Sequence, residues 1–231
     1  MPESQPAPGL RERKKQRTRQ LIADTARRLF VERGFEAVTV TEIAREAEVA
    51  PATVFNYFPT KEDLFYSRLE AFEEELLSAI RNREPGQGVL AALAAFLLDQ
   101  RGVLAMNAPG GDAEATERVR TITRVITSSP ALLARERQVF DDYARALAAL
   151  LAEETGAEPG DARCRVVANA LLGLHRALID HVRERALAGE PAARIRESVR
   201  AEAERSFAQL EHGLGEFGKR VAGPPGLDRS H

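Results

Sequence analysis

The feature that most constrains this chain is a regular alternation of long helix-favouring segments with short breaks. Between the breaks the chain is rich in Ala, Leu, Arg and Glu, which favour helices, and only 6% of its 231 residues are aromatic. Pro cannot continue a helix and Gly weakens one, so the pattern predicts an all-α fold of about nine helices. The breaks are Pro85-Gly86, Pro109-Gly110-Gly111, Ser129-Pro130, Pro159-Gly160 and Gly189-Glu190-Pro191.

Apolar periodicity and capping residues set the expected helix bounds. Thr39 is followed three positions later by Glu42, and Thr60 by Asp63, which is the pattern of a capping box at a helix start. We expect helices over residues 11–33, 40–47, 51–57, 60–83, 88–106, 113–127, 131–154, 161–187 and 192–210.

The clearest break is Pro85-Gly86, and it divides the chain into an N-terminal and a C-terminal region. We expect a disordered lead at 1–9, a helix-turn-helix domain at 10–60, a connecting helix at 61–85, a helical ligand-binding and dimerisation domain at 86–212, and a flexible tail at 213–231.

Charge is distributed unevenly along the chain. Between Leu10 and Arg33 nine basic side chains stand against three acidic ones, although the whole chain has a net charge of −2. A basic N-terminal segment in an otherwise acidic chain indicates that this segment binds a polyanion. The alternative is a charged surface that is merely solvated.

Several protein classes are disfavoured by the composition. The longest apolar run, Val89–Leu98, is about half of what a membrane span needs, and no apolar stretch follows the first basic residues as in a secretory signal. Cys164 is the single cysteine, so an internal disulfide or a multi-cysteine metal site is excluded, and a packing role is expected. These observations together predict a cytoplasmic protein with no membrane partner. We also expect no metal and no cofactor, because no metal-ligand or phosphate-loop motif occurs.

Residues 39–65 carry the functional signal. Two helices, each too short to be stable alone, meet at a tight junction near Ala47–Ala50, with apolar positions on their facing sides. Such a pair serves to present its outer face rigidly, and a major groove is wide enough to admit the second helix. The outer face of that helix would offer Ala50, Pro51, Ala52, Thr53, Asn56 and Tyr57.

The run from Arg17 to Phe65 resembles the DNA-binding domain of the TetR/AcrR family of bacterial repressors. This run is about a quarter of the chain, and its motif spacing is free of gaps. The residues that carry the resemblance are Ala26, Leu29-Phe30, Gly34-Phe35, Thr39-Val40, Glu42-Ile43-Ala44, Val49, Val54-Phe55-Asn56-Tyr57-Phe58 and Lys61-Glu62-Asp63-Leu64.

The resemblance implies a role for each matching position. Thr53 and Asn56 would face bases, Tyr57 and Lys61 would contact phosphates, and the helix amino terminus would assist Lys61. Thr39 and Thr41 at the start of the second helix, together with Ala50, Pro51 and Ala52, complete the expected DNA-facing surface. The basic arm from Arg13 to Arg19, including Lys14 and Arg17, would add contacts to the backbone or an adjacent minor groove.

Two departures from the family pattern affect the expected reading of DNA. Phe55 stands where many members have Tyr, and we interpret it as a wedge packed within the domain. Residues 50–57 contain no Arg or Lys, so bidentate recognition of guanine from this helix is excluded. We therefore expect Asn56 on adenine, with methyl contacts from Ala52 and Thr53 to thymine, to carry much of the discrimination.

In the second region the resemblance implies a four-helix dimer interface and an enclosed ligand pocket. Intramolecular core is the alternative for the candidate interface residues, and plain core is the alternative for the candidate pocket residues. The candidate interface consists of Leu171, Leu174, Leu178, Val182, Val199 and Phe207. The candidate pocket consists of Phe96, Met106, Ile122, Ile126, Phe140, Tyr143 and His175.

The sequence thus predicts a homodimeric repressor that a small apolar or amphipathic effector releases from a palindromic DNA operator. A ligand-independent or activating DNA-binding regulator is the alternative. An all-α enzyme is disfavoured because no nucleophile–base pair or paired-acid arrangement is found. A nonspecific DNA-coating protein would bind any duplex equally, whereas a repressor should prefer its site by about 10³-fold or more.

Overall fold

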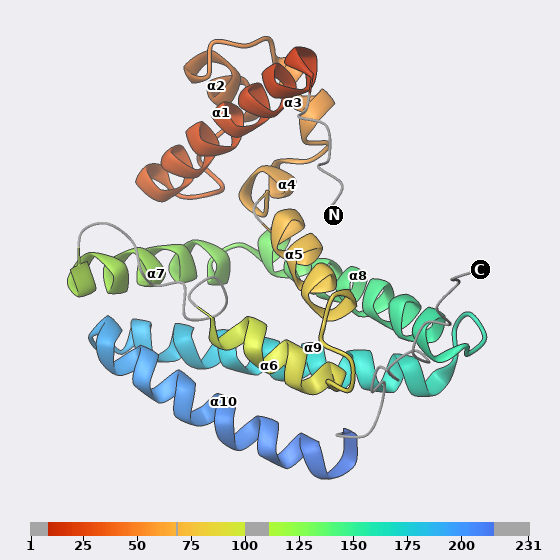
Figure 1. Ribbon diagram of the computed structural model, residues 1–231. Helices are drawn as coiled ribbons and strands as arrows, with labels where there is room; N and C mark the ends of the chain where they lie inside the picture. Colours follow the sequence, from red (N-terminus) through yellow and green to blue (C-terminus); the bar gives the residue numbers. More distant parts are fainter. Residues whose placement is uncertain (1–8, 68, 100–110, 215–231) are drawn as a thin grey trace, which may run out of the picture. The chain divides into compact units, whose positions relative to one another are not determined.

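The computed structural model describes residues 9–67, 69–99 and 111–214, and within these ranges all regular structure is helical (Figure 1). The expectations for the lead at 1–8, for Met106 and for the tail at 215–231 fall outside the described residues. The described helices are α1 (Leu10–Arg33), α2 (Val40–Glu46), α3 (Pro51–Tyr57), α4 (Lys61–Phe65), α5 (Leu69–Arg81), α6 (Val89–Leu98), α7 (Gly111–Thr127), α8 (Pro130–Thr155), α9 (Ala162–Leu187) and α10 (Ala192–Leu214).

The single helix predicted over 60–83, and with it a continuous connecting helix over 61–85, is wrong. The structure has two helices there, and α4 ends at Tyr66, whose φ of −90° and ψ of 13° leave the helical region. The Tyr66 side chain is buried, and its hydroxyl donates to the carbonyl of Leu132 at 3.1 Å. This contact joins residues far apart in the sequence, so local periodicity could not reveal it.

The helix predicted over 88–106 is shorter than expected, because α6 ends at Leu98. Gly88 caps α6, and Asp99 ends it with an extended backbone (φ −68°, ψ 160°). The other predicted helices agree with the structure to within a few residues at each end.

The chain divides into two compact units. The first comprises residues 1–70 and 124–136, so α1 to α4 pack with the end of α7 and the start of α8. Its core consists of buried apolar side chains from all of these segments, among them Ile22, Leu29, Phe30, Phe35, Ile43, Val54, Phe58, Leu64 and Leu132.

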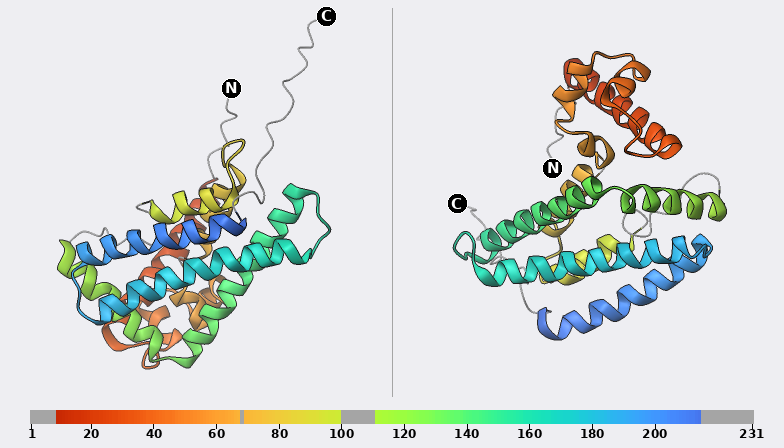
Figure 2. Two further views of the ribbon diagram at one scale, coloured as in Figure 1. Left: turned by 90° about the horizontal axis from the view of Figure 1, so that it is seen from below. Right: turned by 180° about the vertical axis from the view of Figure 1, so that it is seen from behind.

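The second unit comprises residues 71–123 and 137–231. Within it, α10 packs along both α9 and α6, and these three helices are seen side by side in Figure 2. Near the end of α5, the almost fully buried guanidinium of Arg83 forms an ion pair of 2.7 Å with Glu154 of α8 and donates to the carbonyls of Ile80 and Gln87. A buried charge is costly unless it is paired and hydrogen-bonded, and these contacts meet both conditions.

Candidate nucleic-acid interface and effector site

The turn between α2 and α3 is built from local signals. Thr39 accepts a hydrogen bond from the backbone N–H of Glu42 at 3.2 Å, and the Glu42 carboxylate accepts from the Thr39 N–H at 2.8 Å. These two bonds satisfy exposed N–H groups at the helix start. The Thr39 backbone N–H and the Thr39 hydroxyl both donate to the Glu42 carboxylate, and these two bonds hold the pKa of Glu42 below its ordinary value. After α2, Glu48 adopts a left-handed φ of 54°, which turns the chain into α3.

Few side chains anchor helix α3 to the core of the first unit. Val54 is fully buried, and Phe58, directly after the helix, is buried beside it in the same core. Pro51 occupies the first turn, where its missing N–H costs no hydrogen bond. Anchoring one face in this way leaves the opposite face of a rigid seven-residue helix open to solvent.

The predicted DNA-facing residues of α3 lie on that open face or at its margin. Ala50, Pro51, Ala52 and Asn56 are exposed, and Thr53 is half-buried. Tyr57 is half-buried as well, because its ring packs against the core. On α2, Thr41 is exposed, whereas the exposed Thr39 has its hydroxyl engaged by Glu42.

The interpretation of Phe55 as a packed wedge is wrong. Its side chain is 51% exposed, on the same face of the helix as the predicted DNA contacts. The physical reason is the 100° step between successive helical residues: with Val54 pointing into the core, its neighbour is turned away from it. Phe55 therefore belongs to the outward surface of α3.

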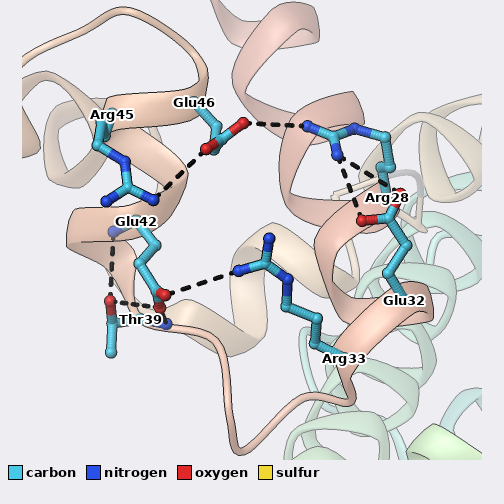
Figure 3. Close-up of polar contacts among 7 residues, drawn as sticks. All are labelled: Arg28, Glu32, Arg33, Thr39, Glu42, Arg45 and Glu46. Atoms are coloured by element: carbon cyan, nitrogen blue, oxygen red, sulfur yellow. Dashed lines mark hydrogen bonds and ion pairs between the residues drawn. The ribbon is translucent and has the colours of Figure 1, made fainter.

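Ion pairs brace α1 against α2, as Figure 3 shows. Arg33 of α1 lies 3.7 Å from Glu42, and Arg28 lies 3.6 Å from Glu46, so two basic residues of α1 contact two acidic residues of α2. Arg28 also reaches Glu32 on its own helix at 3.3 Å. These partly exposed pairs contribute little energy individually, but they orient α2 relative to α1.

The basic residues at the start of α1 are different. Lys14, Lys15 and Arg17 are exposed, and none of them forms an ion pair with another described residue. The positive charge that is free to meet a polyanion therefore includes Lys14, Lys15 and Arg17, while Arg27, Arg28 and Arg33 form ion pairs within the domain. Unpaired exposed cations of this kind are what neutralising DNA phosphates requires.

Lys61 is the first residue of α4, and its ammonium group is partly buried. Its Nζ lies 4.2 Å from the centre of the Phe35 ring, and partial burial lowers the pKa of Lys61, against the opposing effect of nearby Glu36 and Glu62. A phosphate contact by Lys61 stays a prediction.

Sequence reasoning missed the contribution of residues 124–136 to this unit. Ser129 donates to the Glu36 carboxylate at 2.6 Å, and the Tyr66 hydroxyl bonds to Leu132. Ser129 and Leu132 are also fully buried. Only the apolar stripe of α7 and α8 hinted that this segment packs inward, without indicating against which partner.

In the second unit several of the predicted pocket residues come together. His175 is 4% exposed, its ring stacks on Phe72 at a centroid distance of 5.1 Å, and it lies 5.6 Å from Phe140. Phe96 adjoins Phe72 at 5.2 Å, and Tyr143 adjoins Phe140 at 6.1 Å. We call these five rings the aromatic cluster; its member Phe72 was not among the predicted pocket residues.

His175 is chemically unusual within the aromatic cluster. Burial lowers its pKa to about 4, so the ring is neutral at physiological pH. Its buried Nδ1 has no hydrogen-bond partner among the described residues. Of the other predicted pocket residues, Ile122 is half-buried in the second unit, whereas Ile126 is buried in the first unit.

The predicted dimer residues are all buried within the single chain. Leu171, Leu174, Leu178, Val182, Val199 and Phe207 are each at most 8% exposed. This burial is what the alternative of intramolecular core predicts, and a part for these residues in a contact between subunits stays a prediction. An apolar stripe is required by both roles, so periodicity could not separate them.

Two negative findings apply to the described residues. No group of three or more His, Cys, Asp or Glu side chains there is placed to hold a metal ion. None of the helices in these ranges has the length and apolar character of a membrane span.

Two family models match the chain. Residues 22–67 match the model of bacterial regulatory proteins of the tetR family, and residues 100–215 match that of the MftR C-terminal domain.

Named relatives and solved structures agree with these matches. The chain is 31% identical over 156 residues to the HTH-type transcriptional regulator TcmR of Streptomyces glaucescens, covering 67% of each protein. It is 28% identical over 169 residues to the putative mycofactocin biosynthesis transcriptional regulator MftR of Mycobacterium tuberculosis, covering 73% of this chain and 81% of the relative. The fold resembles that of NalD, the secondary repressor of the MexAB-OprM multidrug efflux pump in Pseudomonas aeruginosa, with 20% identity, a TM-score of 0.54, and coverage of 87% and 97% of the two chains. The chain therefore belongs to the TetR family, whose members are DNA-binding transcriptional regulators and not enzymes.

Proposed function

We propose that this protein is a cytoplasmic homodimeric repressor that a small aromatic or amphipathic effector releases from a two-fold DNA operator. The observation that carries the proposal is the outward face of α3. An exposed Asn56 and exposed Ala52 and Phe55 stand on a helix whose opposite side is anchored by Val54.

The proposed reading of DNA follows from the chemistry of this face. The Asn56 amide can pair bidentately with adenine, and Ala52, Thr53 and Phe55 can contact thymine methyl groups, each good base contact contributing about 1–3 kcal/mol of discrimination. Thr39, Thr41, Ala50, Pro51, Tyr57 and Lys61 would position the helix against the backbone. The exposed Lys14 and Arg17 would supply the salt-dependent affinity that an uncharged α3 lacks.

A single α3 reads only a few base pairs, so specificity calls for a two-fold dimer. The exposed stripe of α9 supports an interface there. Val166 is 65% exposed and Leu187 43% exposed, and Ala170, Gly173 and Ala177 lie between them at alternating spacings of three and four residues. Small residues at this spacing let two helices approach closely, and two half-sites would lie about 34–36 Å apart or a multiple of that distance.

The aromatic cluster supports the proposed effector site. A buried imidazole nitrogen without a partner is costly, and a ligand hydroxyl or carbonyl that bonds to Nδ1 of His175 would remove that cost. Rings of Phe72, Phe96 and Phe140 offer stacking surfaces for a planar, uncharged effector. The half-buried Ile122 is a further candidate for its lining.

Helices α7 and α8, each of which has residues in both units, would couple effector binding to DNA binding. Residues 124–136 form part of the DNA-binding unit, and the same helices α7 and α8 continue into the second unit. If the effector prefers the arrangement of α7 and α8 that has the lower affinity for DNA, it must weaken DNA binding by the same coupling free energy, typically about 1–3 kcal/mol.

The experiment is a selection of bound duplexes from a random oligonucleotide pool, followed by mobility-shift titrations of the selected site. Wild type should enrich a palindrome, and Asn56→Ala should lose preference at one symmetric pair of positions while Gln138→Ala, at an exposed site on α8, should not. Deleting the gene should raise transcription from a promoter that carries the site. Enrichment of no site would contradict sequence-specific binding, and lower transcription in the deletion would identify an activator instead.

A further inference from the structure

A groove with a volume of about 640 Å³ opens in the second unit between α6 and α10. The two helices run side by side, as Figure 2 shows, and the glycines before α6 border one end of the groove. The volume lies within the range of small-molecule pockets, about 300–1,000 Å³. None of the aromatic-cluster residues lines it, so it is separate from the proposed effector site.

The wall formed by α6 is apolar. Leu90, Ala91, Ala94 and Leu98 line it, and Ala91 and Ala94 leave space because their side chains are short. Leu90, Ala94 and Leu98 are four positions apart and Ala91 lies three positions before Ala94, so these residues share one face of the helix. This wall provides a surface for the hydrocarbon part of a ligand.

The wall formed by α10 carries charge. Glu204, Phe207, Ala208 and Glu211 all line the groove, and their spacing places the Phe207 ring between two carboxylates on one helix face. Neither Glu204 nor Glu211 forms an ion pair or hydrogen bond with another described residue. None of the described residues that line the groove is basic, so the two carboxylates give this part of the structure a negative potential over an apolar floor.

We propose that this groove binds a lipophilic cation, with the apolar body against α6 and the positive charge between Glu204 and Glu211 over the Phe207 ring. Carboxylates attract the charge, and the aromatic face adds a cation–π contact. The apolar contacts supply most of the affinity, and the carboxylates determine which sign of charge is accepted. This is a second ligand site, beyond the proposed effector site at His175.

The test uses the full-length protein and two isosteric probes of opposite charge, tetraphenylphosphonium and tetraphenylborate, in calorimetric titrations at low salt. Tetraphenylphosphonium should bind at least about tenfold more tightly, because the two probes differ in charge but present the same phenyl surface. The double variant Glu204→Gln, Glu211→Gln should weaken tetraphenylphosphonium at least about fivefold. Glu197→Gln, at an exposed position of α10 outside the groove, should leave it unchanged.

A second variant tests the location independently of charge. Ala208→Leu places a bulky side chain in the groove between Glu204 and Glu211, so it should weaken tetraphenylphosphonium binding without changing operator binding or the sedimentation of the protein. Equal binding of both probes, or binding that neither set of variants alters, would overturn the proposal. A change of oligomeric state in Ala208→Leu would overturn it too, because the groove would then be a contact between copies of the chain. Operator binding by the same variants is measured separately, so failure here is distinguishable from failure of the proposed repressor function.

Discussion

Arg135 and Asp63, 72 positions apart in the sequence, link the start of α8 to the start of α4. Both Nε and Nη2 of Arg135 lie 2.8 Å from Oδ1 of Asp63, while Oδ2 of the same carboxylate accepts from the Thr60 backbone N–H at 3.0 Å. Asp63 therefore caps the helix that begins with Lys61 and at the same time anchors a segment from the second half of the chain.

Replacing Arg135 should destabilise the DNA-binding unit. In Arg135→Ala the Asp63 carboxylate, only 11% exposed, loses both guanidinium donors and keeps the Thr60 N–H, so we expect a loss of about 1–2 kcal/mol in the free energy of unfolding. Urea denaturation measures it. Arg137→Ala, two positions later and exposed, is the control and should change stability by less than about 0.5 kcal/mol. Equal losses in both variants would show that the Asp63 contact is not the cause.

Phe55 and Phe58 should separate DNA binding from stability. Phe55→Ala removes an exposed ring, so the stability of the protein should stay within about 0.5 kcal/mol of wild type while operator affinity falls. Phe58→Ala empties a 1% exposed core position and should cost about 3–5 kcal/mol. Thermal unfolding and mobility shift on the selected operator measure the two effects. A large loss of stability in Phe55→Ala would restore a packing role for that residue.

The left-handed backbone of Glu48 predicts a stabilising substitution. A non-glycine residue at a φ of 54° is strained, and Gly adopts this conformation without a Cβ clash. Glu48→Gly should raise the free energy of unfolding by up to about 1 kcal/mol, the gain being reduced by the greater entropy of Gly in the unfolded chain. Glu48→Ala retains the strain and should not show the gain. A clear loss in Glu48→Gly would mean that the side chain, rather than the backbone, matters there.

His175 should make stability depend on pH in a defined window. Its pKa falls from 6.5 in the unfolded chain to about 4 in the folded protein, so the unfolded state binds the extra proton between these values. The contribution of neutral, buried His175 is present above pH 6.5 and is lost as pH falls towards 4, by about 3 kcal/mol in total.

The measurement is the difference in unfolding free energy between wild type and His175→Phe at several pH values. Carboxylates that titrate in both proteins cancel in this difference, so the stability of wild type relative to the variant should fall from pH 6.5 to 4 and stay level above pH 7. A difference that is flat across the whole range would mean that the imidazole is not buried in its neutral form.

Much of the architecture could be predicted from the sequence because its signals are local. The capping boxes at Thr39 and Thr60 join residues three positions apart, and both are present as predicted. Helix α3 spans residues 51–57, as predicted. The family resemblance over residues 17–65 also rested on an ordered string of neighbouring residues, and the match to the tetR family model confirms it.

The sequence by itself determined the helical fold, the helix-turn-helix and the basic end, since each depends on propensity, capping or charge within a few residues. Only the tertiary structure decided how the apolar stripes are used. It buried Leu171 and Val199 within the chain, turned Phe55 outward, ended α4 at Tyr66, and added residues 124–136 to the DNA-binding unit. The physical reason is that burial is not directional: an apolar side chain is stabilised by any surface that excludes water, and only the packed partners determine which surface that is.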